Sequence, residues 1–283
     1  MPRPIGGVLA LAWLAGVACT SPTETARLPA TPLIEVWTRG LPAFGVFVPS
    51  EQPRRDADGN RLPPHYTLDG AERLGRDPLL DYLFLNLEGA YDAPAVDTLV
   101  AGLARVSAEE RPTLLVRIPP IEREGEQAAR ARVHDALTRG ADGIVLPHIR
   151  SPEEARVAVR FFEEAEADVW SPANPNGRII AMLMIEDPGA LEAAEAIAET
   201  PGYSVLSCGI GSLTGALGDD RDAGETAAEV ILGHATRVGM PSMMTANRSN
   251  MARRIEQGYL GLLLQMGDDT AETIQLGRAA AGR

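Results

Sequence analysis

The sequence predicts an α/β protein with a single (β/α)8 fold, the TIM barrel. Short apolar runs alternate eight times with helical patterns along the chain. The runs lack strict apolar–polar alternation, as expected for parallel strands buried on both faces. About 255 residues follow an N-terminal export segment, close to the roughly 250 that such a barrel needs. A doubly wound open sheet is the competing fold, but no glycine-rich phosphate loop follows the first run.

The apolar runs give eight expected strands. They cover residues 44–48, 82–87, 113–118, 143–146, 179–185, 204–208, 242–245 and 261–264. The expected helices cover residues 94–105, 125–139, 152–167, 189–199, 222–238, 249–257 and 269–281. Ser151 as N-cap and Pro152 at the first helical position mark one helix start clearly. Gly140 and Gly258 stand where helices are expected to end.

Residues 1–19 are interpreted as a signal peptide of the lipoprotein type. Arg3 supplies the positive charge, and the apolar run that follows has about thirteen residues, fewer than the roughly twenty that span a bilayer. The small residues before Cys19 resemble a bacterial lipoprotein cleavage site, although Gly16 replaces the usual leucine. We therefore expect a lipid on Cys19 that holds the protein at a membrane, facing the periplasm. The alternative is ordinary cleavage and a soluble periplasmic protein.

These boundaries predict three parts of the chain. Residues 1–19 are the signal peptide, residues 20–40 a tether, and residues 41–283 the barrel. In this interpretation, the lipid is the only contact with a membrane. The segment 49–68 is polar and rich in proline, arginine and aspartate, which predicts a long loop on the face where barrel active sites lie. The segment 170–178 precedes the fifth strand and is expected on the opposite face.

Composition excludes several functions. The net charge of −13 argues against nucleic acid as a partner, because phosphate binding needs a basic patch. All 26 basic residues are arginine, so no lysine can form a Schiff base with a substrate or with pyridoxal phosphate. Cys19 and Cys208 are too far apart in sequence for a CxxC metal site. Cys208 lies in an apolar run, which indicates an inert buried thiol.

Catalytic groups of a barrel lie at the C-terminal ends of its strands. The polar residues at these positions are Glu88, Arg117, His148, Glu186, Ser212, Asn247, Gln265 and Asp268. Arg117 and Glu186 follow apolar runs directly, and arginine is well shaped to hold a carboxylate with two hydrogen bonds. The set therefore predicts a site for a small carboxylate.

Six segments, in order and at barrel spacing, resemble the HpcH/HpaI aldolase and citrate lyase β family. They are residues 41–47, 81–89, 115–119, 142–155, 184–186 and 208–214. The resemblance covers roughly residues 42–280 and implies a Mg²⁺- or Mn²⁺-dependent carbon–carbon lyase that acts on a 2-oxo acid. The family's cation stabilises the enolate as a Lewis acid, which requires no lysine. The family also implies a homo-oligomer, formed through its last helices.

The resemblance assigns roles to individual residues. Arg117 is expected to hold the substrate and stabilise the enolate oxygen, and Glu186 to bind the metal. Glu88 is retained from the family's acidic signature. Gly211 and Ser212 lie in the loop that borders the substrate, and Ser212 stands where the family has its metal-binding aspartate. The cation ligands are therefore expected to be Glu186 and Ser212.

The sequence also departs from the family at further positions. Asn86 replaces an aspartate, Gly89 replaces a histidine that moves protons, and Met184 replaces a glutamine. His148 is the candidate for the missing catalytic base. Displaced metal ligands are sought among the nearby acids, which are Asp187, Asp219 and Asp220.

Two further functions remain open beside the divergent lyase. One is a catalytically inactive barrel, tethered at the cell envelope, that binds an acidic small molecule through Arg117. The other is a structural or assembly role.

Overall fold

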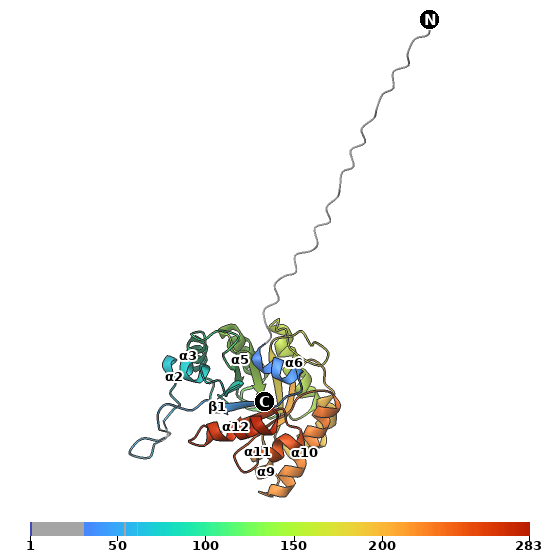
Figure 1. Ribbon diagram of the computed structural model, residues 1–283. Helices are drawn as coiled ribbons and strands as arrows, with labels where there is room; N and C mark the ends of the chain where they lie inside the picture. The colour runs from blue at the N-terminus through green and yellow to red at the C-terminus, as the bar shows by residue number, and fades with distance from the viewer. Residues whose placement is uncertain (2–30, 54, 61) are drawn as a thin grey trace.

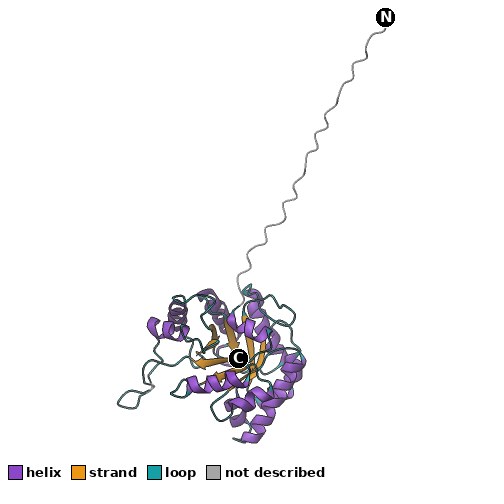
Figure 2. Ribbon diagram, in the orientation of Figure 1, coloured by secondary structure: helices purple, strands orange, loops and turns teal. Residues whose placement is uncertain are grey.

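The computed structural model describes residues 1, 31–53, 55–60 and 62–283, and residues 2–19 of the expected signal peptide, which include Cys19, lie outside them. Eight parallel strands surround one centre, with helices around the outside (Figures 1 and 2). The strands are β1 Ala43–Phe47, β2 Tyr82–Asn86, β3 Thr113–Arg117, β4 Gly143–Leu146, β5 Ile180–Ile185, β6 Val205–Cys208, β7 Met243–Thr245 and β8 Gly261–Leu264. This architecture confirms the predicted barrel, and each strand overlaps its expected range.

The helices are α1 Pro32–Thr38, α2 Leu68–Gly75, α3 Ala93–Leu103, α4 Ile121–Glu124, α5 Glu126–Arg139, α6 Pro152–Glu164, α7 Pro188–Glu192, α8 Ala194–Ala198, α9 Ile210–Ala216, α10 Arg221–Arg237, α11 Met251–Gln257 and α12 Thr270–Ala280. Seven segments were expected to be helical, and one of them, 189–199, is two short helices. The Ser151 hydroxyl accepts from the Glu154 amide at 3.1 Å, as the capping pattern predicts. No helix among the described residues is long and apolar enough to cross a membrane.

Helix α1 closes the N-terminal end of the barrel. Its residues Leu33, Ile34 and Trp37 are buried against the side chains that fill the barrel interior. The Trp37 indole donates to the Leu260 carbonyl at 2.8 Å and stacks on Trp170 at 5.9 Å. The predicted tether over 20–40 is therefore wrong for residues 32–38, which belong to the folded domain. The Trp37–Trp170 stack also places the start of the 170–178 segment at this end, as expected.

The barrel has one seam, between β6 and β7. The backbone ladder runs in the order β6-β5-β4-β3-β2-β1-β8-β7 and pairs each neighbour in register. Across the seam, the Ser207 hydroxyl donates to the Met243 carbonyl at 2.6 Å. A side chain thus bridges the two strands where no backbone ladder forms.

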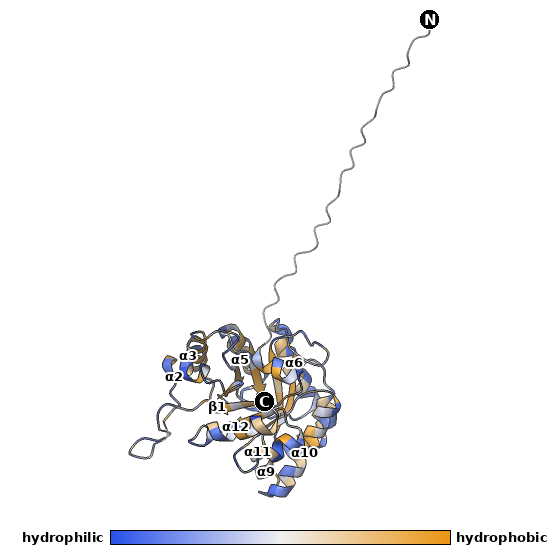
Figure 3. Cartoon of the chain, viewed as in Figure 1, coloured by the Kyte–Doolittle hydropathy of each residue, from blue (hydrophilic) through white to orange (hydrophobic). Residues whose placement is uncertain are grey.

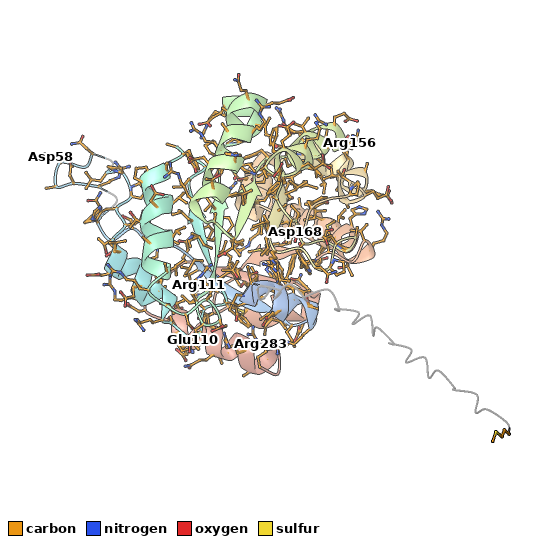
Figure 4. All side chains as sticks on the ribbon, turned by 90° about the horizontal axis from the view of Figure 1, so that it is seen from above. Asp58, Glu110, Arg111, Arg156, Asp168 and Arg283 are labelled. Atoms are coloured by element: carbon orange, nitrogen blue, oxygen red, sulfur yellow. The ribbon has the colours of Figure 1, made fainter. Side chains whose placement is uncertain are left out.

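The core has an inner and an outer layer. Inside the barrel, β-strand residues such as Phe84, Val145 and Met182 pack together. Outside it, a second layer lies between strands and helices, and the helices turn their polar faces outward (Figure 3). The long loop after β1 projects from the body, with Asp58 near its tip (Figure 4). This arrangement leaves the C-terminal strand ends free for a site.

Candidate active site

Four of the predicted site residues meet at the C-terminal ends of β2 to β5. Arg117 ends β3, and its Nη2 donates to Glu88 Oε1 at 2.9 Å and to Glu186 Oε2 at 2.7 Å. His148 lies after β4, with Nε2 3.3 Å from Glu88 Oε1 and 3.7 Å from Glu186 Oε2. The β2–β5 register brings these strand ends side by side. The structure thus assembles Glu88, Arg117, His148 and Glu186 into one cluster.

Arg117 is the buried cation of this cluster. Only 8% of the residue is exposed, and its Nε is a buried donor without a hydrogen-bond partner among the described residues. An unpaired buried donor costs about 1–3 kcal/mol, so such an atom usually awaits a water or a ligand. A carboxylate or keto oxygen that accepts from Arg117 would remove this cost.

The backbone of His148 holds its ring toward the acids. Its φ of +54° lies in the left-handed region, which costs a residue with a Cβ roughly 1 kcal/mol or more. The His148 amide donates to Glu186 Oε2 at 3.3 Å, and the Ile149 amide donates to the Met184 carbonyl at 2.9 Å. These contacts fix the turn that aims the imidazole at the cluster.

Acidic neighbours alter the protonation of His148 and Glu88. The pKa of His148 is raised to about 9, first by the hydrogen bond to Glu88 and then by the charges of Glu186 and Asp187, against the opposing effect of burial. The same hydrogen bond lowers the pKa of Glu88, and the charges of Arg117 and Arg123 act in the same direction. Near pH 7 without a bound cation, the pair is therefore an imidazolium beside a carboxylate.

Glu186 is the most deeply buried acid of the site, with 1% of its surface exposed. Gly209 leaves room for it, because a Cβ at position 209 would stand 1.8 Å from Glu186 Oε1. The neighbouring Cys208 is inert, since burial and the charge of Glu186 raise the pKa of its thiol to about 12. A side chain at position 209 would displace the Glu186 carboxylate from its place beside the end of β6.

A cavity of about 170 Å³ opens beside Arg117 and Glu186. Gly211 and Ser212, at the start of α9, form part of its wall, as expected for residues that border a substrate. Apolar side chains line most of the rest: Phe47, Phe84, Met182, Met184, Met243 and Met244. Glu88 and His148 do not line this cavity, but they contact Arg117 and Glu186, which do. We name it the catalytic cavity.

The ligand atoms of Glu88, His148 and Glu186 all lie within 4.8 Å of one another, a spacing that fits a metal ion. Two carboxylates and an imidazole suit Mn²⁺ well, whereas Mg²⁺ prefers oxygen ligands. Ser212 lines the catalytic cavity with Glu186 but offers only a neutral hydroxyl. The donor set therefore fits a divalent cation, with Glu88 and His148 available beside Glu186.

The other candidates have different places. Asp187 contacts the ring of His148, with Oδ2 3.3 Å from Nδ1. Asp220 caps α10 by accepting from the amides of Asp222 and Ala223, so its carboxylate has the role of a helix cap and not that of a metal ligand. Asn86 is exposed and accepts from the Glu88 amide at 3.2 Å. Asp219 lies in a neighbouring cavity.

Sequence reasoning missed two features of the site. One is Gly209, whose position directly after β6 is the only signal in the sequence. The other is Arg123, which donates to the Glu88 carbonyl. This contact depends on the short helix α4, which no sequence pattern announces.

Comparison with known proteins identifies relatives of the chain. A 4-hydroxy-4-methyl-2-oxoglutarate aldolase of Chaetomium globosum is 32% identical over 158 residues, which cover 48% of this chain and 58% of that protein. The chain thus spans little more than half the length of the curated relatives it matches.

Solved structures share the fold. An HpcH/HpaI aldolase/citrate lyase family protein of Burkholderia cenocepacia J2315 superposes with a TM-score of 0.64 at 22% identity, over 89% of this chain and 98% of that one. The citrate lyase β subunit of M. tuberculosis, complexed with oxaloacetate and magnesium, gives 0.55 at 17% identity, over 87% and 99%. The family model for HpcH/HpaI aldolase/citrate lyase matches residues 79–275. The chain belongs to the HpcH/HpaI aldolase/citrate lyase family.

Proposed function

We propose that this protein is a divalent-metal-dependent aldolase that makes or breaks a carbon–carbon bond next to the carbonyl of a 2-oxo acid. The single observation that carries the proposal is Arg117, a buried guanidinium at the wall of the catalytic cavity with an unpaired Nε and with Glu186 at 2.7 Å. The aldolase activity of the relative and the absence of lysine both support it.

The substrate would bind in exchange for Glu88. A carboxylate or keto oxygen that replaces Glu88 Oε1 at Arg117 Nη2 comes next to the His148 ring, because that oxygen lies 3.3 Å from Nε2. The carbon chain then extends into the methionine-lined catalytic cavity. Glu88, which is partly exposed, moves aside and remains close enough to exchange protons.

In the cleavage direction, Glu88 accepts the proton of the 4-hydroxyl group and the C3–C4 bond breaks. Its electron pair forms the C2–C3 double bond of an enolate, whose negative oxygen faces Arg117. The His148 imidazolium then donates a proton to C3, and Glu88 returns its proton to His148. The products are a shorter 2-oxo acid and an aldehyde or ketone. The residues that would hold the cation are Glu186 and Ser212, which leaves Glu88 and His148 to move the protons, and the cation would supply Lewis-acid stabilisation of the enolate.

Exchange of the pyruvate methyl protons with deuterated water tests this proposal, because it requires only the enolate. We expect exchange with Mn²⁺ or Mg²⁺, loss of exchange with a chelator, and a loss of at least 100-fold in Glu186→Gln. Glu153→Gln is the matched control, since Glu153 pairs with Arg156 at the outer edge of α6 (Figure 4). Metal-independent exchange would contradict the cation requirement. Oxalate binding without any exchange would favour the inactive barrel instead.

We also propose that the protein is exported, is attached through a lipid on Cys19, and assembles as a homo-oligomer. The apolar run and small residues before Cys19 support the first two points. Cys19→Ser should move the protein from the membrane to the soluble fraction. Sedimentation of residues 31–283 tests the oligomer, and a single monomeric species would contradict it.

A further inference from the structure

The two nitrogens of the His148 ring lie near different carboxylates. Nε2 is 3.3 Å from Glu88 Oε1, and Nδ1 is 3.3 Å from Asp187 Oδ2. Asp187 stands at the start of α7, and its side chain is 39% exposed, whereas that of His148 is 24% exposed. The ring therefore joins Glu88, a member of the cluster, to an acid at the outer edge of the site.

Asp187 is the N-cap residue of α7, but its carboxylate does not cap the helix. Aspartate at this position usually accepts a hydrogen bond from an amide of the first turn. Asp92 does so at the start of α3, where Oδ1 accepts from the Ala95 amide at 3.2 Å. Among the described residues, the Asp187 carboxylate has the His148 ring as its only hydrogen-bond partner. An aspartate that leaves the usual local bond for a ring in the site indicates a functional role.

A surface ion pair does not account for the position of Asp187. Arg150 is near enough for its charge to interact with that of Asp187. Its guanidinium, however, pairs with Glu122 at 3.0 Å and with Glu154 at 3.1 Å. Within the part of the chain that the structure describes, no arginine forms a salt bridge with Asp187, so its carboxylate is left to the ring.

The backbone places the His148 ring but does not determine which edge faces Glu88. The His148 amide donates to Glu186 Oε2 at 3.3 Å, which holds the main chain. Rotation of the ring by half a turn about the Cβ–Cγ bond would exchange Nε2 with Cε1 and Nδ1 with Cδ2. Glu88 would then face a carbon, and proton transfer between the two side chains would stop. Because a carbon cannot replace Nδ1 as a donor to Asp187, this bond opposes the rotation.

We propose that Asp187 is a positioning residue that fixes the His148 ring with Nε2 directed at Glu88. This role rests on the proposed function, in which His148 and Glu88 exchange a proton. Asp187 accepts a hydrogen bond from Nδ1 and takes up no proton during the reaction. Two consecutive residues after β5 thus have separate tasks, since Glu186 lines the catalytic cavity and Asp187 orients the ring.

The test measures pyruvate proton exchange at saturating Mn²⁺ in the wild type and in Asp187→Ala. We expect kcat to fall about tenfold or more, because a histidine that loses its orienting partner loses much of its function. The KM for pyruvate should stay within about twofold, since Asp187 does not line the catalytic cavity. Asp269→Ala is the matched control, because Asp269 is the N-cap of α12 and also makes no side-chain cap bond. Thermal unfolding verifies that each variant is folded.

A double-mutant cycle separates positioning from a structural role. In the His148→Gln background, Asp187→Ala should cause no further loss of kcat, because Asp187 acts through the ring. Three results would overturn the inference: an equal loss of kcat in both backgrounds, a wild-type kcat in Asp187→Ala, or a raised KM with an unchanged kcat.

Failure of the proposed function is separate, because it appears as absent exchange in the wild type with every cation. Proton–nitrogen NMR of histidine-labelled protein then tests the orientation alone. The chain has four histidines, and His148→Gln identifies the signals of the ring at position 148. We expect an Nδ1–H signal that is present in the wild type and in Asp269→Ala and absent from Asp187→Ala. A wild-type protein without this signal, or an Asp187→Ala variant that retains it, would reject the orienting bond.

Discussion

The raised pKa of His148 predicts that the cation-free protein loses stability as the pH rises from 6 to 8.5. The shift from 6.5 to about 9 arises first from the hydrogen bond to Glu88, with further contributions from Glu186 and Asp187. The folded state therefore binds a proton that the unfolded chain releases near pH 6.5. A group whose pKa is raised on folding stabilises the protein fully below its unfolded pKa, and this contribution is lost as the pH approaches the folded pKa.

The magnitude follows from linkage. One unit of pKa shift corresponds to about 1.4 kcal/mol, so the full contribution below pH 6.5 is about 3 kcal/mol. Most of it, about 2 kcal/mol, disappears between pH 6 and 8.5. The His148 side chain is 24% exposed, so solvent screening reduces this value only in part.

Urea unfolding in the presence of a chelator measures the effect. The free energy of unfolding is determined at pH 6 and pH 8.5 for the wild type and for His148→Gln. The difference between the two proteins cancels every other titrating group, including the Cys208 thiol. We expect the wild-type advantage at pH 6 to decrease by about 2 kcal/mol at pH 8.5. If the stability difference between the two proteins does not depend on pH, His148 is not held as an imidazolium. The protonation states assigned to the His148–Glu88 pair would then be wrong.

Three further changes give sharp outcomes. Ser212→Asp restores a carboxylate beside Glu186 and should raise the affinity for Mg²⁺ by about tenfold or more in calorimetry, because hard cations prefer carboxylate oxygens; an unchanged affinity would place the cation elsewhere. Gly209→Ala should lower the free energy of unfolding by about 1–3 kcal/mol, since the new Cβ would stand 1.8 Å from Glu186 Oε1. A variant as stable as the wild type would show that the Glu186 carboxylate moves freely. Arg283→Ala should lower the free energy of unfolding, measured in urea, by about 1–3 kcal/mol, because Arg283 pairs with the buried Asp81 at 2.8 Å. Arg278 remains as the second partner of Asp81 in this variant. No loss would mean that Arg278 alone satisfies Asp81.

The strands were predictable from sequence because parallel strands buried on both faces must be apolar throughout. Each apolar run therefore identified a strand to within one residue at each end. The helices α1, α2, α4 and α9 were not expected. They are four to eight residues long, and two of them contain glycine, so their periodicity covers too few turns to stand out. Packing against the barrel stabilises these helices, and the local sequence pattern does not indicate this packing.

The site was predictable only as far as strand ends determine it. Arg117 and Glu186 were identified because they directly follow apolar runs. The contact between His148 and Asp187 depends on a left-handed backbone at position 148, and no residue-type pattern encodes it for histidine. The cavity of about 690 Å³ between α9, α10 and the segments that follow β7 and β8 was not predictable either, because its wall combines segments after β6, β7 and β8 whose spacing is set by helix packing.

Ser212, at the position where the sequence resemblance predicts a metal-binding aspartate, and His148 have a joint consequence for cation binding. Without a cation, Arg117 and protonated His148 pair with Glu88 and Glu186. A cation that binds through His148 must first displace its proton, because only the neutral ring is a ligand. Its affinity should then rise up to tenfold per pH unit below about pH 9. A cation held by Glu186 and Ser212 alone would show no such slope, so the pH dependence of Mn²⁺ affinity distinguishes the two ligand sets.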